Sequence, residues 1–476
     1  MNKLPDISHD FAEWYQEVIY QSELVDSSPV RGTMVIRPYG YALWERVVTI
    51  LDDKIKKTGH QNASFPLFIP ESFLQKEAKH VEGFAPELAI VTHAGGKKLE
   101  EPLIVRPTSE TIIHYMFARW IKSWRDLPLK INHWSNVVRW EMRPRAFLRT
   151  TEFLWQEGHT AHETLEQARE EVMLMLGEYV DLAQQYLAIP VITGQKTEHE
   201  RFPGAVETHT FEAVMQDGKA LQMGTSHLLS QSFAHAFDMK FQNRENKMAY
   251  PYLTSWGATT RLIGAVVMVH GDQKGLVLPP RIAPIQVVIL LILLKNRDNS
   301  TILSAAQRLK QQLCAESIRV HIDDDMHNSL GHRLYYWELR GVPIRIEIGP
   351  RDLEKGHVLV TDRIGLLTLS EQSVAIDSVA SILPTCLERI QSALLDRARE
   401  RLHTQWHRGE KLTDFGSILE KEGGLYQTGW CGSSECELAL KNYKAFTRCL
   451  REEKTFDFCF NCDKPSNQDV LVAKAY

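Results

Sequence analysis

The sequence predicts a multidomain α/β protein built from three successive regions, residues 1–280, 281–390 and 391–476. The chain has 476 residues, more than one hydrophobic core usually holds, so roughly two to four domains are expected. Its 43% hydrophobic and 24% charged residues are typical of globular proteins. Five of the seven cysteines fall after residue 430, which sets the last region apart from the other two.

Charge and hydropathy limit the class of protein and its location. The net charge of −5 argues against a general polycation, although a local basic face for nucleic acid is compatible with it. The N-terminal stretch lacks the apolar core of a signal peptide. The most apolar run, 287–294, is far shorter than the roughly 20 residues of a membrane-spanning helix. We therefore expect a cytoplasmic protein with no membrane partner and with reduced thiols.

The first region mixes helices with alternating strands. One helix is predicted to begin near Thr160, where Thr160 and Glu163 have the spacing of a capping box. Pro190 is expected to end it. Apolar residues recur at helical spacing at Leu165, Ala168, Val172, Leu176 and Val180.

The second region alternates strands and helices. Its segments read "IQVVILLILL", "TILSAAQRLKQQL", "IRVHID", "LGHRLYYWELRG" and "PIRIEIGP". This βαβαβ order predicts a small, mainly parallel sheet with crossover helices. The third region is predicted to open with a charged helix.

Four arginines, Arg139, Arg143, Arg145 and Arg149, crowd into residues 139–149. The flanking segments "NVVRWEM" and "RTTEFLWQEGH" predict an antiparallel hairpin. Alternation would place one set of side chains on a single face of its second strand, namely Arg149, Thr151, Phe153, Trp155 and Glu157. Arginine forks, an aromatic ring and carboxylates on one surface suit a nucleoside triphosphate. A salt-bridged surface hairpin is the alternative.

The C-terminal cysteines form two close pairs, Cys431 with Cys436 and Cys459 with Cys462. Four thiolates in this pattern are typical of a tetrahedral Zn²⁺ site with a structural role. Cys449 is a fifth candidate ligand. The alternative is a set of reduced thiols without metal.

Three segments in order resemble the signature motifs of class II aminoacyl-tRNA synthetases. The first is "RGTMVIRPYGYALWERVVTIL" with Pro38, and the third is "SWGATTRLIGAVVMVHGD" with Gly257 and Arg261. The arginine hairpin resembles the second motif, with Arg139 two residues before Glu141 and Arg149 four before Phe153.

The specific resemblance is to prolyl-tRNA synthetases of the archaeal and eukaryote-like type. It rests on "VRPTSE", "FLRTTEFLWQEGHTAH", "KALQMGTSHLL" and "GVPIRIEIGPRD". The resemblance implies an antiparallel-sheet catalytic domain, an α/β anticodon-binding domain and a C-terminal zinc-binding α+β domain. Only about a hundred residues separate Glu157 from Gly257, which leaves no room for an editing insertion there.

The resemblance implies that L-proline attacks ATP with Mg²⁺ present, and that proline is then transferred to tRNA(Pro). Arg139 and Arg261 are the residues expected to stabilise the charge on the phosphates. Glu141 and the Thr150 backbone are expected at the adenine edge. The full set of residues expected to bind ATP is Arg139, Glu141, Arg149, Thr150, Phe153, Gln222, Thr225, Thr259 and Arg261.

For proline, the resemblance implies that Thr108 and Glu110 capture the ammonium group. The other residues expected to contact proline are Arg139, Trp155, Glu157, Phe202, His227 and Ser255. Trp155 and Phe202 could instead be ordinary core aromatics, and His227 a structural histidine. Alanine is smaller than proline and cannot be excluded by size, so correction of mischarging would fall to a separate trans-editing protein.

The resemblance implies that the anticodon contacts Glu338, Arg345, Arg351 and Asp352, and arginine and carboxylates can read guanine edges. These residues could instead be solvated charges at strand ends. Family spacing favours leaving Cys449 out of the zinc site, and the terminal Tyr476 is expected to fold back toward the active site. The first motif implies a homodimer. The rival readings are a synthetase for another amino acid, such as threonine, and a catalytically silent paralogue.

Overall fold

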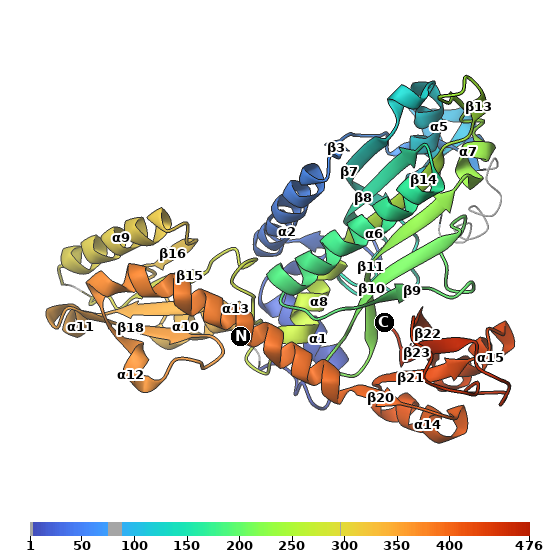
Figure 1. Cartoon of the computed structure of the whole chain (residues 1–476). Coiled ribbons are helices and arrows are strands. Elements are labelled where there is room, and N and C mark those ends of the chain that lie inside the picture. The colour runs from blue at the N-terminus through green and yellow to red at the C-terminus, as the bar shows by residue number, and fades with distance from the viewer. Residues whose placement is uncertain (1–2, 75–87, 296) are drawn as a thin grey trace.

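The computed structural model describes residues 3–74, 88–295 and 297–476. Its first region is built on a seven-stranded sheet that is antiparallel except at β3 (Figure 1). In spatial order the strands are β3 (Gln61–Asn62), β7 (Leu129–Val138), β8 (Glu152–His162), β14 (Tyr252–Thr259), β11 (Ala220–Ser230), β10 (Glu207–Val214) and β9 (Ile192–Gln195).

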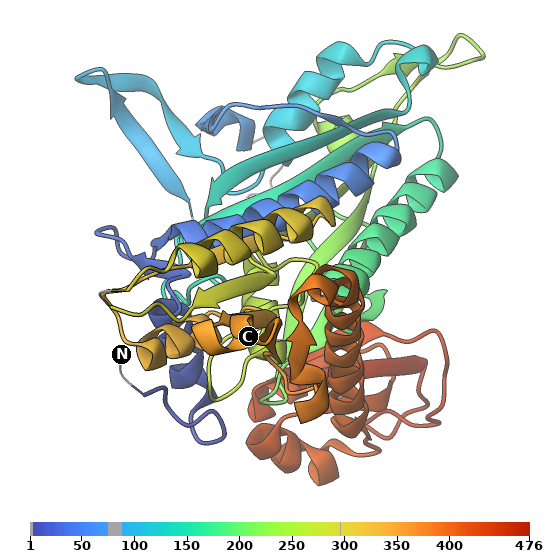
Figure 2. The ribbon, with the colours of Figure 1, turned by 90° about the vertical axis from the view of Figure 1, so that its left-hand side faces the viewer.

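Helices and short strands surround this sheet. The helices include α1 (Phe11–Gln21), α2 (Pro38–Lys57), α3 (Glu71–Leu74), α5 (Glu110–Trp120), α6 (Leu165–Asp181), α7 (Ser232–Ala236) and α8 (Arg261–His270). The short strands include β1 (Val25–Ser27), β2 (Met34–Ile36), β4 (Phe68–Pro70), β5 (Ala89–Ala94), β6 (Lys97–Val105), β12 (Phe241–Gln242) and β13 (Met248–Ala249). Strands β5 and β6 project from the body of the molecule (light blue, upper left in Figure 2).

Helix α6 lies across one face of the sheet and leaves the other face open for the site described below. Tyr179 on α6 donates a hydrogen bond to Gln156 on β8, and Ser226 on β11 donates to the Val172 carbonyl at 2.9 Å. The predicted apolar spacing is confirmed at Ala168, Val172 and Leu176, all of which are buried. This buried stripe holds the helix against the sheet.

The predicted start of this helix was wrong. Thr160 belongs to β8 and pairs with Thr254 of β14, so sheet pairing through His162 excludes helix there. The N-cap is Thr164, whose hydroxyl accepts from the Gln167 N–H at 3.3 Å. The helix ends at Asp181 and continues as a π-helical turn over Leu182–Tyr186, before Pro190 is reached.

The second region has a five-stranded sheet in the order β16-β15-β17-β18-β19. Its elements are β15 (Val287–Leu291), α9 (Ser300–Ala315), β16 (Val320–Asp323), α10 (Leu330–Leu339), β17 (Ile344–Ile348), α11 (Pro350–Glu354), β18 (His357–Asp362), α12 (Leu369–Gln372) and β19 (Ser373–Ala375). The predicted βαβαβ unit is confirmed, because β15 is parallel to both β16 and β17. Strands β18 and β19 extend it antiparallel, which the sequence had not indicated.

A single long helix, α13 (Val379–Thr404), leads from the second region to the third (orange in Figure 1). Its Gln391 amide donates to the Gln185 carbonyl at 2.9 Å and its Arg401 to the Val269 carbonyl at 2.6 Å. The helix is therefore fastened to the first region at both points.

The third region is a four-stranded sheet in the order β20-β21-β23-β22, with two helices. Its elements are β20 (Trp406–Arg408), α14 (Leu412–Glu422), β21 (Leu425–Trp430), α15 (Ser434–Ala439), β22 (Ala445–Leu450) and β23 (Gln468–Lys474). Within the described residues, no helix is both long and apolar enough to cross a membrane.

Candidate active site

A cavity of about 380 Å³ opens on the face of the large sheet opposite α6. All the residues predicted to bind ATP or proline line this single cavity. They are Thr108, Glu110, Arg139, Glu141, Arg149, Thr150, Phe153, Trp155, Glu157, Phe202, Gln222, Thr225, His227, Ser255, Thr259 and Arg261. The set comes from α5, β8, β11, β14, α8 and the loops between them.

All four arginines lie in the loop between β7 and β8. This was expected for Arg143 and Arg145, but Arg139 and Arg149 were predicted to lie on the strands. Regular pairing stops at Val138 opposite Glu152. The Arg139 N–H still reaches the Thr151 carbonyl at 2.8 Å, but the Thr151 N–H turns to the Gly32 carbonyl instead. The predicted alternation is therefore wrong for Arg149 and Thr151, and it holds only from Phe153 onward.

At one end of the cavity, guanidinium groups are fixed by backbone carbonyls. Arg261, the first residue of α8, donates to the Leu148 carbonyl at 3.1 Å and to the Gln222 carbonyl at 3.0 Å. Burial, together with the nearby Arg149 and Arg139 charges, lowers the pKa of Arg261 to about 10. Guanidinium groups that repel one another at one end of a cavity favour a polyanionic ligand there.

Arg139 lies between this end and the aromatic part of the cavity. Its Nε donates to the Pro107 carbonyl at 2.9 Å, and its guanidinium carbon is 5.5 Å from the ring centroids of both Phe153 and Trp155. Glu141 pairs with Arg149 at 3.4 Å. The guanidinium of Arg139 can therefore contact both an anion and a small ligand held against Trp155.

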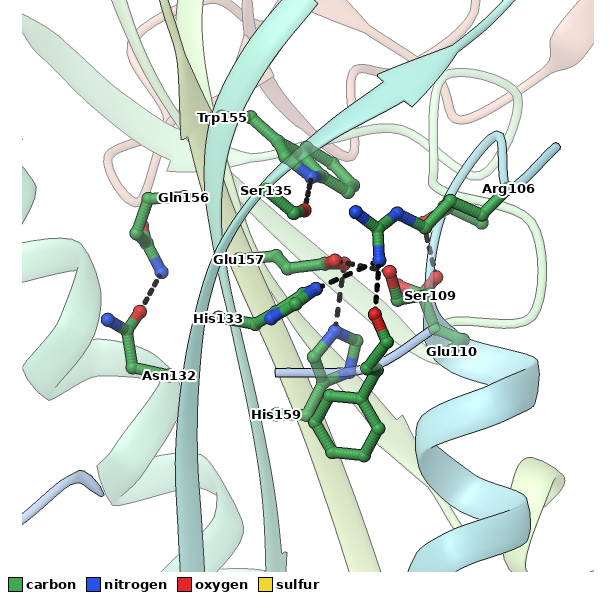
Figure 3. A network of polar contacts seen from close by, with 12 residues as sticks. Arg106, Ser109, Glu110, Asn132, His133, Ser135, Trp155, Gln156, Glu157 and His159 are labelled. Carbon is green, nitrogen blue, oxygen red and sulfur yellow. Dashed lines mark hydrogen bonds and ion pairs between the residues drawn. The ribbon is translucent and has the colours of Figure 1, made fainter. Parts of the chain in front are cut away.

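The other end is a buried polar network around Glu157 (Figure 3). Glu157 accepts a hydrogen bond from Ser109 and faces His159 Nε2 at 3.1 Å, while Thr108 donates to Glu110. Burial opposes a charge on His159, but the Glu157 carboxylate outweighs it and raises the His159 pKa. Two buried carboxylates at one end of a cavity favour a cationic group on the ligand.

Aromatic residues and hydroxyl groups wall this end. Phe202 stacks on His227 with ring centroids 4.5 Å apart. His227 lies 3.0 Å from the Thr208 hydroxyl and 2.9 Å from that of Thr225, and burial lowers its pKa to about 3. The ring is therefore neutral at physiological pH. The buried Ser255 hydroxyl has no hydrogen-bond partner among the described residues.

Sequence reasoning missed some residues of this site. His159 continues the alternation of Phe153, Trp155 and Glu157 along β8, so period two was a signal that could have found it. Ser109 directly follows Thr108 in the quoted motif. Other residues that were missed, including Thr208, Glu200 and Arg201, line the cavity but follow no pattern in the sequence.

The residues predicted for the anticodon are only partly brought together. Glu338 and Arg345 line a second cavity, of about 610 Å³, between the first and second regions. Glu338 pairs there with Lys274 at 3.0 Å, and Arg345 with Glu347 at 3.0 Å. Arg351 and Asp352 lie in α11, outside the residues that line this cavity.

The sulfur atoms of Cys431, Cys436, Cys459 and Cys462 lie within 4.8 Å of one another. Cys431 Sγ is 3.8 Å from Cys436 Sγ and 3.6 Å from Cys462 Sγ. A tetrahedral zinc ion with Zn–S bonds of about 2.3 Å separates its sulfurs by about 3.8 Å, so the four thiols fit that ion. Cys449 lies apart on β22, with its sulfur 3.9 Å from the Thr193 carbonyl.

Comparisons with protein families cover most of the chain. Residues 92–270 match the tRNA synthetase class II core domain (G, H, P, S and T), and residues 286–385 match the anticodon binding domain. Residues 412–476 match the C-terminal domain of prolyl-tRNA synthetase.

Curated relatives and solved structures match over nearly full length. A proline–tRNA ligase of Acetoanaerobium sticklandii is 48% identical, covering 99% of this chain and 98% of its own. Proline–tRNA ligase 2 of Streptomyces avermitilis is 52% identical, covering 98% of both chains. The prolyl-tRNA synthetase of Cryptosporidium parvum, complexed with halofuginone and AMPPNP, has a TM-score of 0.93 at 39% identity, covering 99% of both chains.

The same Cryptosporidium parvum enzyme complexed with L-proline and AMP has a TM-score of 0.92 at 37% identity, covering 100% of this chain and 99% of its own. In this chain, residues 163–251, all of them described, connect β8 to β14 through α6, β9 to β13 and α7, without a further domain. Fold, cavity and relatives agree, and the chain belongs to the prolyl-tRNA synthetase family, the proline–tRNA ligases of the class II aminoacyl-tRNA synthetases.

Proposed function

We propose that this enzyme activates L-proline with ATP to prolyl-adenylate and pyrophosphate, and then transfers proline to the 3′-terminal adenosine of tRNA(Pro). The observation that carries the proposal is the single cavity that holds both residue sets, arginines at one end and a carboxylate network at the other. The relatives named above support the same reaction.

In the first step, a proline carboxylate oxygen attacks the α-phosphorus of ATP, and the bond to the leaving pyrophosphate breaks. Negative charge increases on the phosphate oxygens, and fixed cations stabilise it without reorganising. Arg139 is proposed to contact the α-phosphate and the proline carboxylate, and Arg261 the γ-phosphate. Their backbone hydrogen bonds to Pro107, Leu148 and Gln222 hold both guanidinium groups in place. No covalent enzyme intermediate is needed.

The remaining cavity residues are assigned by their position. Glu141, Thr150 and Phe153 would contact adenine, and Arg149, Gln222, Thr225 and Thr259 the rest of the nucleotide or the tRNA end. Thr108, Glu110 and Glu157 would bind the proline ammonium. Trp155, Phe202, His227 and Ser255 would enclose the ring, since a neutral His227 adds no charge to repel the ammonium.

Two metal ions belong to the proposal. Mg²⁺ would accompany the triphosphate, whose phosphate oxygens would supply most of its ligands. Zn²⁺ would be held by the four clustered cysteines. With four protein ligands it keeps no open position, so its contribution is to hold α15 and the loop before β23 together.

We also propose how the chain contacts the anticodon, where its domains end, how it assembles and which partner it needs. Glu338 and Arg345 at the second cavity, together with Arg351 and Asp352 on α11, would read the anticodon of tRNA(Pro). The proposed domain limits are 1–280, 281–390 and 391–476.

A cytoplasmic homodimer, formed through the segment around Pro38, is the expected assembly. Because alanine fits any pocket that admits proline, a separate trans-editing protein would remove mischarged alanine.

Proline-dependent exchange of pyrophosphate into ATP tests the proposal. Arg139→Ala should lower this exchange by at least about 10²–10³-fold, the usual cost of removing a donor to a developing oxyanion. Arg399→Ala, which breaks an exposed ion pair with Asp396 on α13, is the matched control and should keep full activity. Exchange driven by threonine but not by proline would overturn the assignment of proline as the substrate. If no amino acid drives exchange, the catalytically silent paralogue would be favoured.

A further inference from the structure

The C-terminal region meets the catalytic region along β22 and β9, close to the amino-acid end of the cavity. Gly194 of β9 lies so near β22 that a β-carbon there would come within 2.7 Å of the Leu450 carbonyl oxygen and 2.8 Å of Cys449 Cβ. Only a residue without a side chain fits this approach. The Gly194 backbone therefore packs directly against the Leu450 carbonyl and the Cys449 side chain.

A buried ionic cluster crosses this contact. Glu212 on β10 pairs with Lys196 at 2.5 Å and with Arg448 of β22 at 2.6 Å, and all three side chains are at least nine-tenths buried. Although burial alone would raise the Glu212 pKa, Arg448 and Lys196 lower it to about 2. The C-terminal region thus supplies one of the two cations that keep this carboxylate ionised inside the protein.

A second buried contact lies one residue further along the chain. The Thr197 hydroxyl donates to Glu437 Oε1 at 2.6 Å, and Thr447 donates to the same oxygen. Thr197 and Glu437 are both buried. The C-terminal region therefore contacts Thr197 directly and Lys196 through their shared partner Glu212, just before the loop that runs to Phe202.

Hydrogen bonds continue from these two residues to the pocket wall. The Lys196 N–H donates to the Thr208 carbonyl at 2.8 Å. The Thr208 hydroxyl in turn accepts from the Phe202 N–H at 3.1 Å and lies 3.0 Å from His227 Nδ1. Phe202 and His227 are the stacked pair that would enclose proline.

We propose that the C-terminal region positions the amino-acid pocket, with Arg448 and Thr197 as positioning residues for Phe202 and His227. This inference rests on the proposed function of the cavity. The nucleotide-end arginines lie outside the hydrogen bonds that run from Thr197 to His227, although the charges of Arg448 and Glu212 both act on Arg261. Loosening the Thr197–Glu437 contact should therefore weaken proline binding more than ATP binding.

Two isosteric substitutions test the proposal. Thr197→Val removes the hydroxyl that bonds to Glu437. Thr428→Val is the matched control, because Thr428 is buried in the same C-terminal sheet and its hydroxyl has no partner among the described residues. In proline-dependent exchange, Thr197→Val should raise KM for proline about tenfold, a typical effect of misplaced substrate contacts, with KM for ATP changed less than about twofold.

Arg448→Met and Arg448→Lys provide the second measurement. The methionine variant should raise KM for proline more than Thr197→Val does, and lysine should restore part of the loss because it keeps the cation beside Glu212. Calorimetric titration of L-proline into enzyme saturated with a non-hydrolysable ATP analogue should report the same order of affinities, independently of turnover.

The possible outcomes distinguish the positioning role from the proposed synthetase activity. Equal KM values for proline in the Thr197→Val and Thr428→Val enzymes, or parallel increases in KM for proline and ATP, would overturn the positioning role while wild-type exchange still supports the synthetase. Absence of proline-dependent exchange in the wild-type enzyme would remove both.

Discussion

At the scale of single residues, the cysteines occupy two distinct environments. Four thiols converge from α15 and the loops beside it, whereas Cys449 is buried against Thr193 of the catalytic region. Spacing along the chain could not separate the fifth cysteine from the other four. The difference is one of position in the fold, since β22 carries Cys449 to the opposite side of the C-terminal sheet from the cluster.

Metal analysis of the purified enzyme should find about one zinc per chain. Cys459→Ser removes one of the four thiols, and the three left should hold the metal far more weakly. Its zinc content should fall well below one equivalent, and the thermal midpoint should drop. Cys449→Ser is the control, and it should keep the full equivalent. Zinc well below one equivalent in the wild-type enzyme would contradict the site.

Motif resemblance predicted a set of residues that the structure brings together in one cavity, and Gln222 and Ser255, for example, belong to short stretches with a recognisable sequence. It could not supply Arg448, which lies 236 residues from its partner Glu212 in a segment with no pattern of its own. A long-range ion pair leaves no periodic signal. Such positioning contacts emerge only from the three-dimensional arrangement.

At the scale of elements, a glycine determines how two central strands of the large sheet pack. Gly158 of β8 lies opposite Trp256 of β14, and a β-carbon there would come within 2.0 Å of the indole ring. The ring lies flat across the neighbouring strand because that position carries no side chain. Alternation on β8 then brings Glu157 and His159 to the cavity face.

Two glycine substitutions should have opposite effects on stability. Gly158→Ala should lower the free energy of unfolding by at least about 1–3 kcal/mol, because the rigid indole cannot give way. Gly177→Ala in α6 meets nothing within 4 Å and should raise it by about 0.5–1 kcal/mol, since alanine favours helix. Urea unfolding measures both, and a Gly158→Ala enzyme as stable as wild type would contradict the packing.

Element boundaries were predicted less well than the elements themselves. The capping box assigned to Thr160 and Glu163 failed because strand pairing decides the state of those residues, and pairing partners are distant in sequence. The hairpin was predicted correctly as a hairpin, but its loop is longer and spans residues 139–151, because Gly32, from the β1–β2 connection, competes for the Thr151 N–H. Local patterns identify elements, whereas tertiary contacts fix where they stop.

At the scale of the whole molecule, buried histidines make stability depend on pH. Burial lowers the pKa of His162 and His270 to about 4 and that of His227 to about 3. The unfolded chain takes up these protons below about pH 6.5, while the folded protein does not. Stability is therefore lost as the pH falls. His159, with its raised pKa, opposes the loss.

Between pH 7.5 and 5, each of the three low-pKa histidines should cost about 2 kcal/mol of unfolding free energy. His270→Gln keeps a donor for the Leu187 carbonyl, which His270 Nε2 now contacts at 2.9 Å, but cannot titrate. Over this pH range the free energy of unfolding of His270→Gln should therefore fall by about 2 kcal/mol less than that of the wild-type enzyme. Chemical denaturation at several pH values gives the slopes, and identical slopes would refute this account.

Helix α13 has 26 residues and joins regions that are each anchored independently. Every residue of a helix advances it by about 1.5 Å and turns it by about 100°. One residue inserted after Leu394 would thus rotate the C-terminal sheet out of phase with β9 and separate Arg448 from Glu212. The same insertion in the turn at 243–247, between β12 and β13, would be absorbed locally. The length of α13 therefore sets an angular register between the ends of the molecule, and insertions or deletions there should be far more damaging than most substitutions.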